Sequence, residues 1–68
     1  MMYQLLILRH PADGGNRMIG PCTRAECRDE IEAISTDHAW HWVPQADGSQ
    51  LAVADGDSAT VAEAIPLA

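Results

Sequence analysis

Residues 22–34 read CTRAECRDEIEAI, and this stretch predicts the helix around which the rest of the chain folds. Thr23 is followed three positions later by Glu26, which is the pattern of a capping box. In that motif each side chain satisfies a backbone donor that the first helical turn leaves unpaired. With Thr23 as the cap, Cys22 and Cys27 fall at the two positions of a hydrophobic staple. The pattern therefore predicts an α-helix that begins after Thr23.

The predicted helix has three distinct sides. At 100° per residue, Cys27, Ile31 and Ile34 form an apolar stripe that should face the core. Carboxylates gather on nearly the opposite side, at Glu26, Asp29 and Glu30. One flank carries an i, i+4 series of charged residues, Arg24, Arg28 and Glu32.

The segment before the helix predicts a strand and a second, shorter strand. Residues 3–10 read YQLLILRH, a short apolar run with polar ends that is typical of a buried strand. The turn-rich residues 11–16, PADGGN, follow, and residues 17–20, RMIG, can return as the partner strand of a hairpin. Gly20 and Pro21 then separate this hairpin from the helix.

Residues 38–55, HAWHWVPQADGSQLAVAD, predict a second hairpin. A two-residue turn at Asp47 and Gly48 pairs Trp42 with Val53 and Pro44 with Leu51. This register places four large apolar residues on one face, namely Trp40, Trp42, Leu51 and Val53. Because Pro44 lacks a backbone N–H, the first strand of this hairpin should lie at an edge or end near Pro44.

The last segment, residues 57–65, reads DSATVAEAI and precedes Pro66. Asp57 or Ser58 can cap a helix, and the alanine-rich run favours a short C-terminal helix, although its alternation also permits a strand. The sequence thus predicts one α+β domain over residues 1–68. Its central helix packs on a small, mostly antiparallel sheet of three or four strands, followed by the short C-terminal helix.

The size of the chain bears on its class. A domain of 68 residues buries only about 60% of the surface of its unfolded chain, which argues against a deep catalytic cleft. The serines have no flanking glycines that would form a nucleophile elbow. We therefore expect a non-enzymatic protein without a cofactor. No apolar run approaches the roughly 20 residues of a membrane span, and the N-terminus lacks the features of a signal peptide, so we expect a cytoplasmic location.

Charge is distributed unevenly along the chain. The first 28 residues hold four arginines and two acids, a net charge of +2, whereas the last 40 hold eight acids and no Lys or Arg, a net charge of −8. A field of one sign repels nucleic acid and attracts basic partners. Direct nucleic-acid binding is therefore not expected, and a basic nucleic-acid-binding protein is the expected partner.

In its small size, acidity and lack of catalytic residues, the chain resembles the small phage-encoded anti-CRISPR inhibitors, several of which mimic DNA. The resemblance implies an inhibitor in the host cytoplasm, monomeric or weakly dimeric, that blocks the DNA-binding site of a CRISPR effector such as a Cascade-type complex. Carboxylates imitating phosphates would form its partner-binding surface. The candidates are Glu26, Asp29, Glu30, Glu32, Asp37, Asp47, Asp55, Asp57 and Glu63.

Two alternatives remain open from the residues alone. The chain can be a structural or accessory subunit of a phage or other complex that pairs through the strand edge at residues 40–43 or through the alanine-rich face of the hairpin. It can also be a small zinc protein, because two thiolates and two imidazoles complete a tetrahedral site. The zinc candidates are Cys22, Cys27, His38 and His41. Their spacing only approximates known zinc patterns, and the staple accounts for both cysteines without a metal.

Overall fold

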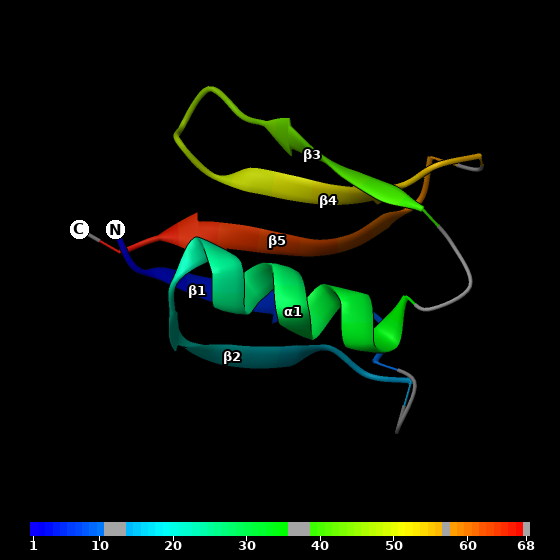
Figure 1. Ribbon diagram of the computed structural model, residues 1–68, viewed down its shortest axis with the longest axis horizontal. Helices are drawn as coiled ribbons and strands as arrows, with labels where there is room; N and C mark the ends of the chain where they lie inside the picture. Colours follow the sequence, from blue (N-terminus) through cyan, green and yellow to red (C-terminus); the bar gives the residue numbers. More distant parts are fainter. Residues whose placement is uncertain (11–13, 36–38, 57, 68) are drawn as a thin grey trace.

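The computed structural model describes residues 1–10, 14–35, 39–56 and 58–67. The elements in these residues are β1 (Tyr3–Ile7), β2 (Arg17–Cys22), α1 (Arg24–Ile34), β3 (Trp40–Pro44), β4 (Gln50–Ala54) and β5 (Thr60–Pro66). The strands form one antiparallel sheet in the order β2-β1-β5-β4-β3, with α1 on one face (Figure 1). The predicted α+β class is confirmed, and the sheet has five strands instead of the three or four expected.

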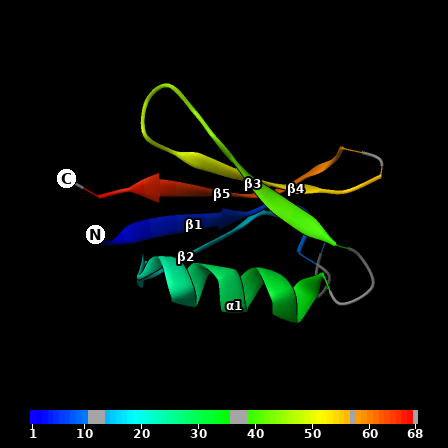
Figure 2. The same ribbon diagram turned by 45° about the horizontal axis from the view of Figure 1, so that its top comes forward.

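The two ends of the chain meet in the middle of the sheet. β1 pairs with β5 from Tyr3 opposite Pro66 to Ile7 opposite Ala62, and the N–H of Leu67 donates to the carbonyl of Met2 at 2.9 Å. The edge strands are β2 and β3, and the chain passes between them through α1. Figure 2 shows that α1 covers one side of the sheet only.

The start of α1 is the capping box predicted from the sequence. The backbone N–H of Thr23 donates to Oε1 of Glu26 at 2.8 Å, and the N–H of Glu26 donates to Oγ1 of Thr23 at 3.2 Å. The predicted staple is also present, since the Sγ atoms of Cys22 and Cys27 lie 3.0 Å apart in the buried interior. Both cysteines are free thiols.

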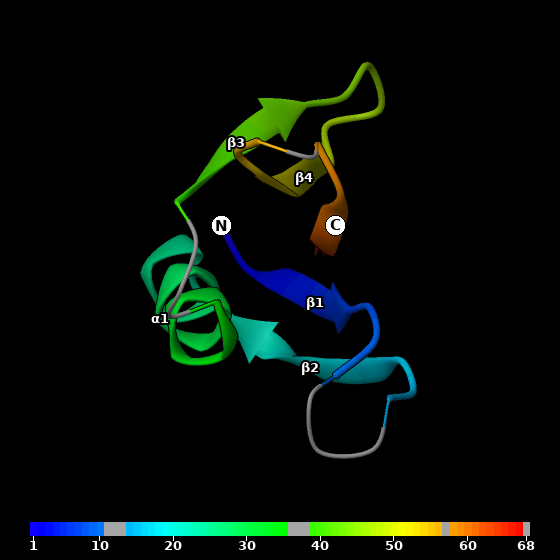
Figure 3. The same ribbon diagram turned by 90° about the vertical axis from the view of Figure 1, so that its right-hand side faces the viewer.

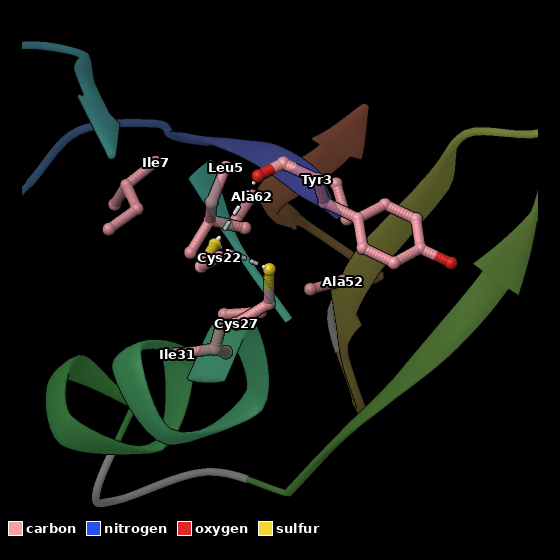
Figure 4. Close-up of a cluster of buried hydrophobic side chains, with 9 residues drawn as sticks. Tyr3, Leu5, Ile7, Cys22, Cys27, Ile31, Ala52 and Ala62 are labelled. Atoms are coloured by element: carbon pink, nitrogen blue, oxygen red, sulfur yellow. Dashed lines mark hydrogen bonds between the residues drawn. The ribbon is translucent and has the colours of Figure 1, made fainter. Parts of the chain in front are cut away.

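The core lies between α1 and the sheet face that it covers (Figure 4). Cys27 and Ile31 of α1 are fully buried against Leu5 and Ile7 of β1. The facing positions of β4 and β5 are small, and they are occupied by Ala52, Ala54, Ala62 and Ala64. Small side chains let a helix and larger neighbours approach the sheet closely, which suits a core without phenylalanine.

The register of the second hairpin differs by one residue from the prediction. Trp42 pairs with Ala52, not with Val53, and Pro44 pairs with Gln50, not with Leu51. Because successive side chains of a strand point to opposite faces, a slip of one residue moves a whole strand's set to the other face. The indoles of β3 therefore share the helix side of the sheet with alanines, and Leu51 and Val53 lie on the opposite side.

The reason for this shift is the turn. Gln45 and Ser49 are joined by a hydrogen bond of 2.8 Å, and the N–H of Gly48 donates to the Gln45 carbonyl at 3.2 Å. With φ of +92° at Gly48, this is a three-residue loop that ends in a left-handed residue, instead of the expected two-residue turn. Asp47 secures it by accepting from the N–H and the hydroxyl of Ser49, at 2.9 and 2.6 Å.

The prediction of a short C-terminal helix is wrong, because residues 60–66 form strand β5. β5 lies between β1 and β4, where Ala62 and Ala64 are buried and Glu63, which lies between them, is half-buried. Alanine has high helix propensity, but two flanking strands offer β5 hydrogen bonds on both sides, and tertiary pairing outweighs local propensity.

Candidate binding groove

An open groove of about 930 Å³ separates α1 from β3. α1 packs against β1, β2 and β5, and Figure 3 shows β3 and β4 curling away from it. The groove is lined mainly by Arg24, Arg28, Glu32, Ser35, Trp40 and Trp42. It therefore lies where the helix no longer covers the sheet, next to an edge strand.

The helix contributes the charged wall of the groove. Arg24, Arg28 and Glu32 are spaced by four residues, so they lie one above the other on one flank of α1. That flank turns towards β3 because Cys27 and Ile31 fix the rotation of the helix by burying the neighbouring stripe. Two guanidinium groups and one carboxylate thus line the groove in sequence.

β3 contributes the aromatic wall. The rings of Trp40 and Trp42 are half-buried, lie 5.0 Å apart between centroids and meet edge to face at 87°. Both pack against the core cluster, on the face where their partners Ala54 and Ala52 are small. Aromatic rings with one packed side and one accessible side are typical of binding surfaces.

The two arginines of the groove differ in their contacts. Nη2 of Arg24 donates to Oε1 of Gln50 at 3.0 Å, and the guanidinium carbon lies 5.9 Å from the centroid of the Trp42 ring. Arg24 therefore ties the first turn of α1 to the hairpin. The side chain of Arg28, one turn further, has no hydrogen-bond or ion-pair partner among the described residues. It is the guanidinium of the groove that is available to a ligand, next to the Glu32 carboxylate one turn further along α1.

On the side away from β4, the backbone of β3 presents N–H and C=O groups that no described strand pairs with. The hydrogen bonds Gln45 to Ser49 and Asp55 to Ala39 show that the odd-numbered residues of this hairpin bond across it. Antiparallel pairs alternate between bonded and non-bonded positions, so the N–H and C=O groups of Trp40 and Trp42 point to the free edge. Pro44 has the same orientation, which is the position in an edge strand where a missing N–H costs no ladder bond.

The predicted acidic surface is dispersed over the molecule. Glu26, Asp29 and Glu30 are exposed on the outer side of α1, and Glu32 lines the groove. Hydrogen bonds, first from the backbone and then from the side chain of Thr23, lower the pKa of Glu26. The structure therefore brings three of the candidates together on the solvent side of the helix.

The other acids lie elsewhere. Asp47 is in the β3–β4 turn, where hydrogen bonds from Ser49 lower its pKa. Oδ1 of Asp55 lies 2.6 Å from Nδ1 of His41, beside the β4–β5 turn. Glu63 is half-buried on the sheet face opposite α1, among Leu51 and other half-buried apolar residues. Asp37 and Asp57 lie outside the described residues.

The zinc candidates occupy separate places. Cys22 and Cys27 are in the core, whereas His41 is exposed and paired with Asp55, and His38 lies outside the described residues. Burial raises the pKa of Cys27 to about 12, and the hydrogen bond and charge of Cys22 add to the effect, so this thiol resists conversion to the thiolate that binds metal. Within the described ranges no three metal-binding side chains converge.

The sequence shows the residues of both walls but does not bring the walls together. The i, i+4 series on the helix and the two tryptophans on one strand face are both visible in it, yet the predicted register places the tryptophans with Leu51 and Val53. The missing signal was the hairpin register, which the Ala46-Asp47-Gly48 loop sets.

Comparison with known protein families, curated proteins and solved structures gave no match for this chain. No helix in the described part of the chain is long and apolar enough to cross a membrane.

Proposed function

We propose that this protein is a non-enzymatic binding protein that holds a protein partner in the groove between α1 and β3. The observation that supports the proposal is the composition of the groove, which sets Arg24 and Arg28 opposite Trp40 and Trp42. Arg and Trp are the residue types that dominate the binding energy of protein interfaces. The groove supplies them together in a chain that is otherwise acidic and small.

The chemistry of the groove favours an acidic segment of the partner. Arg28 has no side-chain partner among the described residues, so a carboxylate can pair with it without displacing an existing bond. A nucleic acid also carries negative charge, but the net charge of −6 opposes the approach of a polyanion over the rest of the surface. A short acidic peptide presents little charge outside the groove.

A selection experiment tests this function. The protein is immobilised and panned against a phage library of random linear peptides, and we expect the enriched sequences to be rich in Asp and Glu. The enriched peptides should bind the Arg28→Glu variant at least about tenfold more weakly, which corresponds to the loss of roughly one charged pair. Arg17→Glu is the matched control, because Arg17 is exposed on β2 at the opposite edge of the sheet. Equal binding to both variants would contradict a role for the groove.

A second candidate function is the mimicry of phosphates by the outer side of α1. It is favoured by the exposed carboxylates of Glu26, Asp29 and Glu30, which lie within two turns of one helix. In this hypothesis the partner is a basic nucleic-acid-binding protein, such as a subunit of a CRISPR effector, and the chain acts as an inhibitor in the host cytoplasm. Its cofactor-free mechanism is electrostatic competition with DNA.

The two candidates respond differently to charge reversal. The double change Asp29→Lys with Glu30→Lys should abolish inhibition of DNA binding by a Cascade-type effector if mimicry operates, and Arg28→Glu should leave that inhibition unchanged. If the partner binds in the groove instead, Arg28→Glu should abolish the inhibition and the double change should leave it unchanged. Inhibition that persists at high salt and ignores both changes would contradict mimicry.

A further inference from the structure

We propose that the partner of the groove is an extended acidic segment that adds to the sheet as a sixth strand along the free edge of β3. This inference rests on the proposed function, and it names the conformation and chemistry of the bound segment. Three independent features of the groove support it: the orientation of the β3 backbone, the spacing of the charged helix flank and the position of the indoles.

The outer edge of β3 offers backbone donors and acceptors to which a further strand can bond. The N–H groups of Ala52 and Ala54 serve the β5 side, as the 2.9 Å bond from Ala54 to the carbonyl of Ala59 shows. Their partners Trp42 and Trp40 consequently direct N–H and C=O groups outwards. An antiparallel segment can exchange pairs of hydrogen bonds with both residues, which is the main-chain part of recognition by strand addition.

The helix flank matches the spacing of such a segment. Alternate side chains of a strand lie about 6.6 Å apart, and residues four apart on a helix lie about 6 Å apart along its axis. Carboxylates on alternate residues of the added strand can therefore reach Arg28 and those N–H groups of Arg24 that do not bond to Gln50. In an antiparallel pair, the residues that bond to Trp40 and Trp42 also share their face, so these same carboxylate-bearing residues point into the groove.

The arrangement of the indoles favours a peptide strand over stacked nucleobases. Trp40 and Trp42 stand edge to face at 87°, so they do not present a flat stacked platform for consecutive nucleobases. They instead give a half-buried apolar surface next to the backbone edge, on which the aliphatic parts of glutamate side chains can pack. A peptide strand satisfies the edge, the arginines and the indoles at once.

The test uses a peptide of alternating glutamate and threonine, acetylated and amidated at its ends, with the glutamine–threonine peptide as the neutral control. Binding is followed by tryptophan fluorescence, and backbone hydrogen exchange is followed by NMR. We expect the acidic peptide to bind at least about tenfold more tightly than the neutral one. We also expect the exchange of the Trp40 and Trp42 amides to slow on binding, because both amides become hydrogen-bonded.

Backbone N-methylation separates the strand mode from the groove function. Methylation of the glutamate nitrogens should abolish binding, and methylation of the threonine nitrogens should be tolerated, because only the former face β3 in an antiparallel pair. Equal effects of the two patterns would overturn strand addition. If binding still depended on Arg28 in that case, the groove function would survive.

Other occupants of the groove are outcomes of the same measurements. Tighter binding of a single-stranded oligothymidine than of the acidic peptide would overturn the peptide assignment in favour of nucleic acid. Protection of the Trp40 and Trp42 amides that grows with protein concentration, without peptide, would assign the edge to a second copy of the chain. Failure of the acidic peptide to bind would overturn the proposed chemistry of the segment.

Discussion

The guanidinium carbon of Arg24 lies 5.9 Å from the centroid of the Trp42 ring, while Nη2 of the same residue donates to Gln50 at 3.0 Å. This contact joins the first turn of α1 to the β3–β4 hairpin, although the helix otherwise packs against β1, β2 and β5. It links the helix wall of the groove directly to the aromatic wall.

Replacing Arg24 should therefore weaken the fold. A cation–π contact at an exposed site contributes about 0.5–1 kcal/mol, so we expect Arg24→Gln to lower the free energy of unfolding by about 1 kcal/mol in urea. Arg28→Gln is the control, because Arg28 lies on the same helix flank without a side-chain partner among the described residues. Equal losses in the two variants would show that the contact with Trp42 contributes nothing.

Acid should destabilise the protein partly through Glu26. Hydrogen bonds from Thr23 lower the pKa of Glu26 below its ordinary value of 4.5. A lowered pKa stabilises the fold above the unfolded value, and this contribution is lost as the pH falls through the folded value. Glu26→Gln should thus show a flatter stability profile below pH 4.5 than the wild type. Glu30→Gln, which changes an exposed carboxylate outside the cap, should keep the wild-type slope in the same urea titrations.

Alkaline conditions should act through Cys27, in the opposite sense. Burial raises the pKa of this thiol from 9.0 to about 12. The contribution of this thiol to the free energy of unfolding is therefore fully present below about pH 9. It is lost as the pH rises towards 12, because in this window the thiol ionises readily only in the unfolded chain. Iodoacetamide should label Cys27 slowly in the native protein at pH 8 and rapidly in urea. Rapid native labelling would contradict a buried, protonated thiol.

Gly20 is a glycine that the pairing of β2 with β1 requires. Its φ is +141°, and a Cβ at this position would lie 2.9 Å from the carbonyl oxygen of Tyr3. Gly56 also has a positive φ, but a Cβ there would meet nothing within 4 Å. Alanine at Gly56 should cost about 1 kcal/mol from backbone strain, and Gly20→Ala should cost at least about 1 kcal/mol more, as measured by thermal unfolding. Similar costs would show that β2 shifts away from β1 without difficulty.

The sequence was informative where a local motif had a single structural solution. The Thr23 and Glu26 pair predicted the start of α1, and the apolar run at residues 3–10 predicted β1, because each depends on neighbouring residues. The segment around Ala62 was ambiguous, since alanine suits a helix and the alternation suits a strand. Residues 60–66 form a strand because they pair with β1 on one side and β4 on the other, and this pairing is a property of the whole sheet.

The groove could not be predicted for a related reason. Its walls come from Arg24 and Arg28 on the helix and from Trp40 and Trp42 on the strand, and both pairs have visible periodicity. Whether they face each other depends on the hairpin register. A change from a two-residue to a three-residue turn shifts that register by one residue and so determines which face of the sheet carries the tryptophans. The Asp47 to Ser49 hydrogen bonds that fix the longer loop arise from a short polar stretch that permits either turn.

The central claim is that the groove, and not the outer side of α1, is the binding surface. The most direct measurement is a titration of the isotope-labelled protein with the glutamate–threonine peptide, followed in nitrogen–proton correlation spectra. We predict that the largest shifts will fall on the backbone and indole N–H groups of Trp40 and Trp42 and on the signals of Arg28. Shifts concentrated instead at Glu26, Asp29 and Glu30, with the tryptophan signals unchanged, would contradict it.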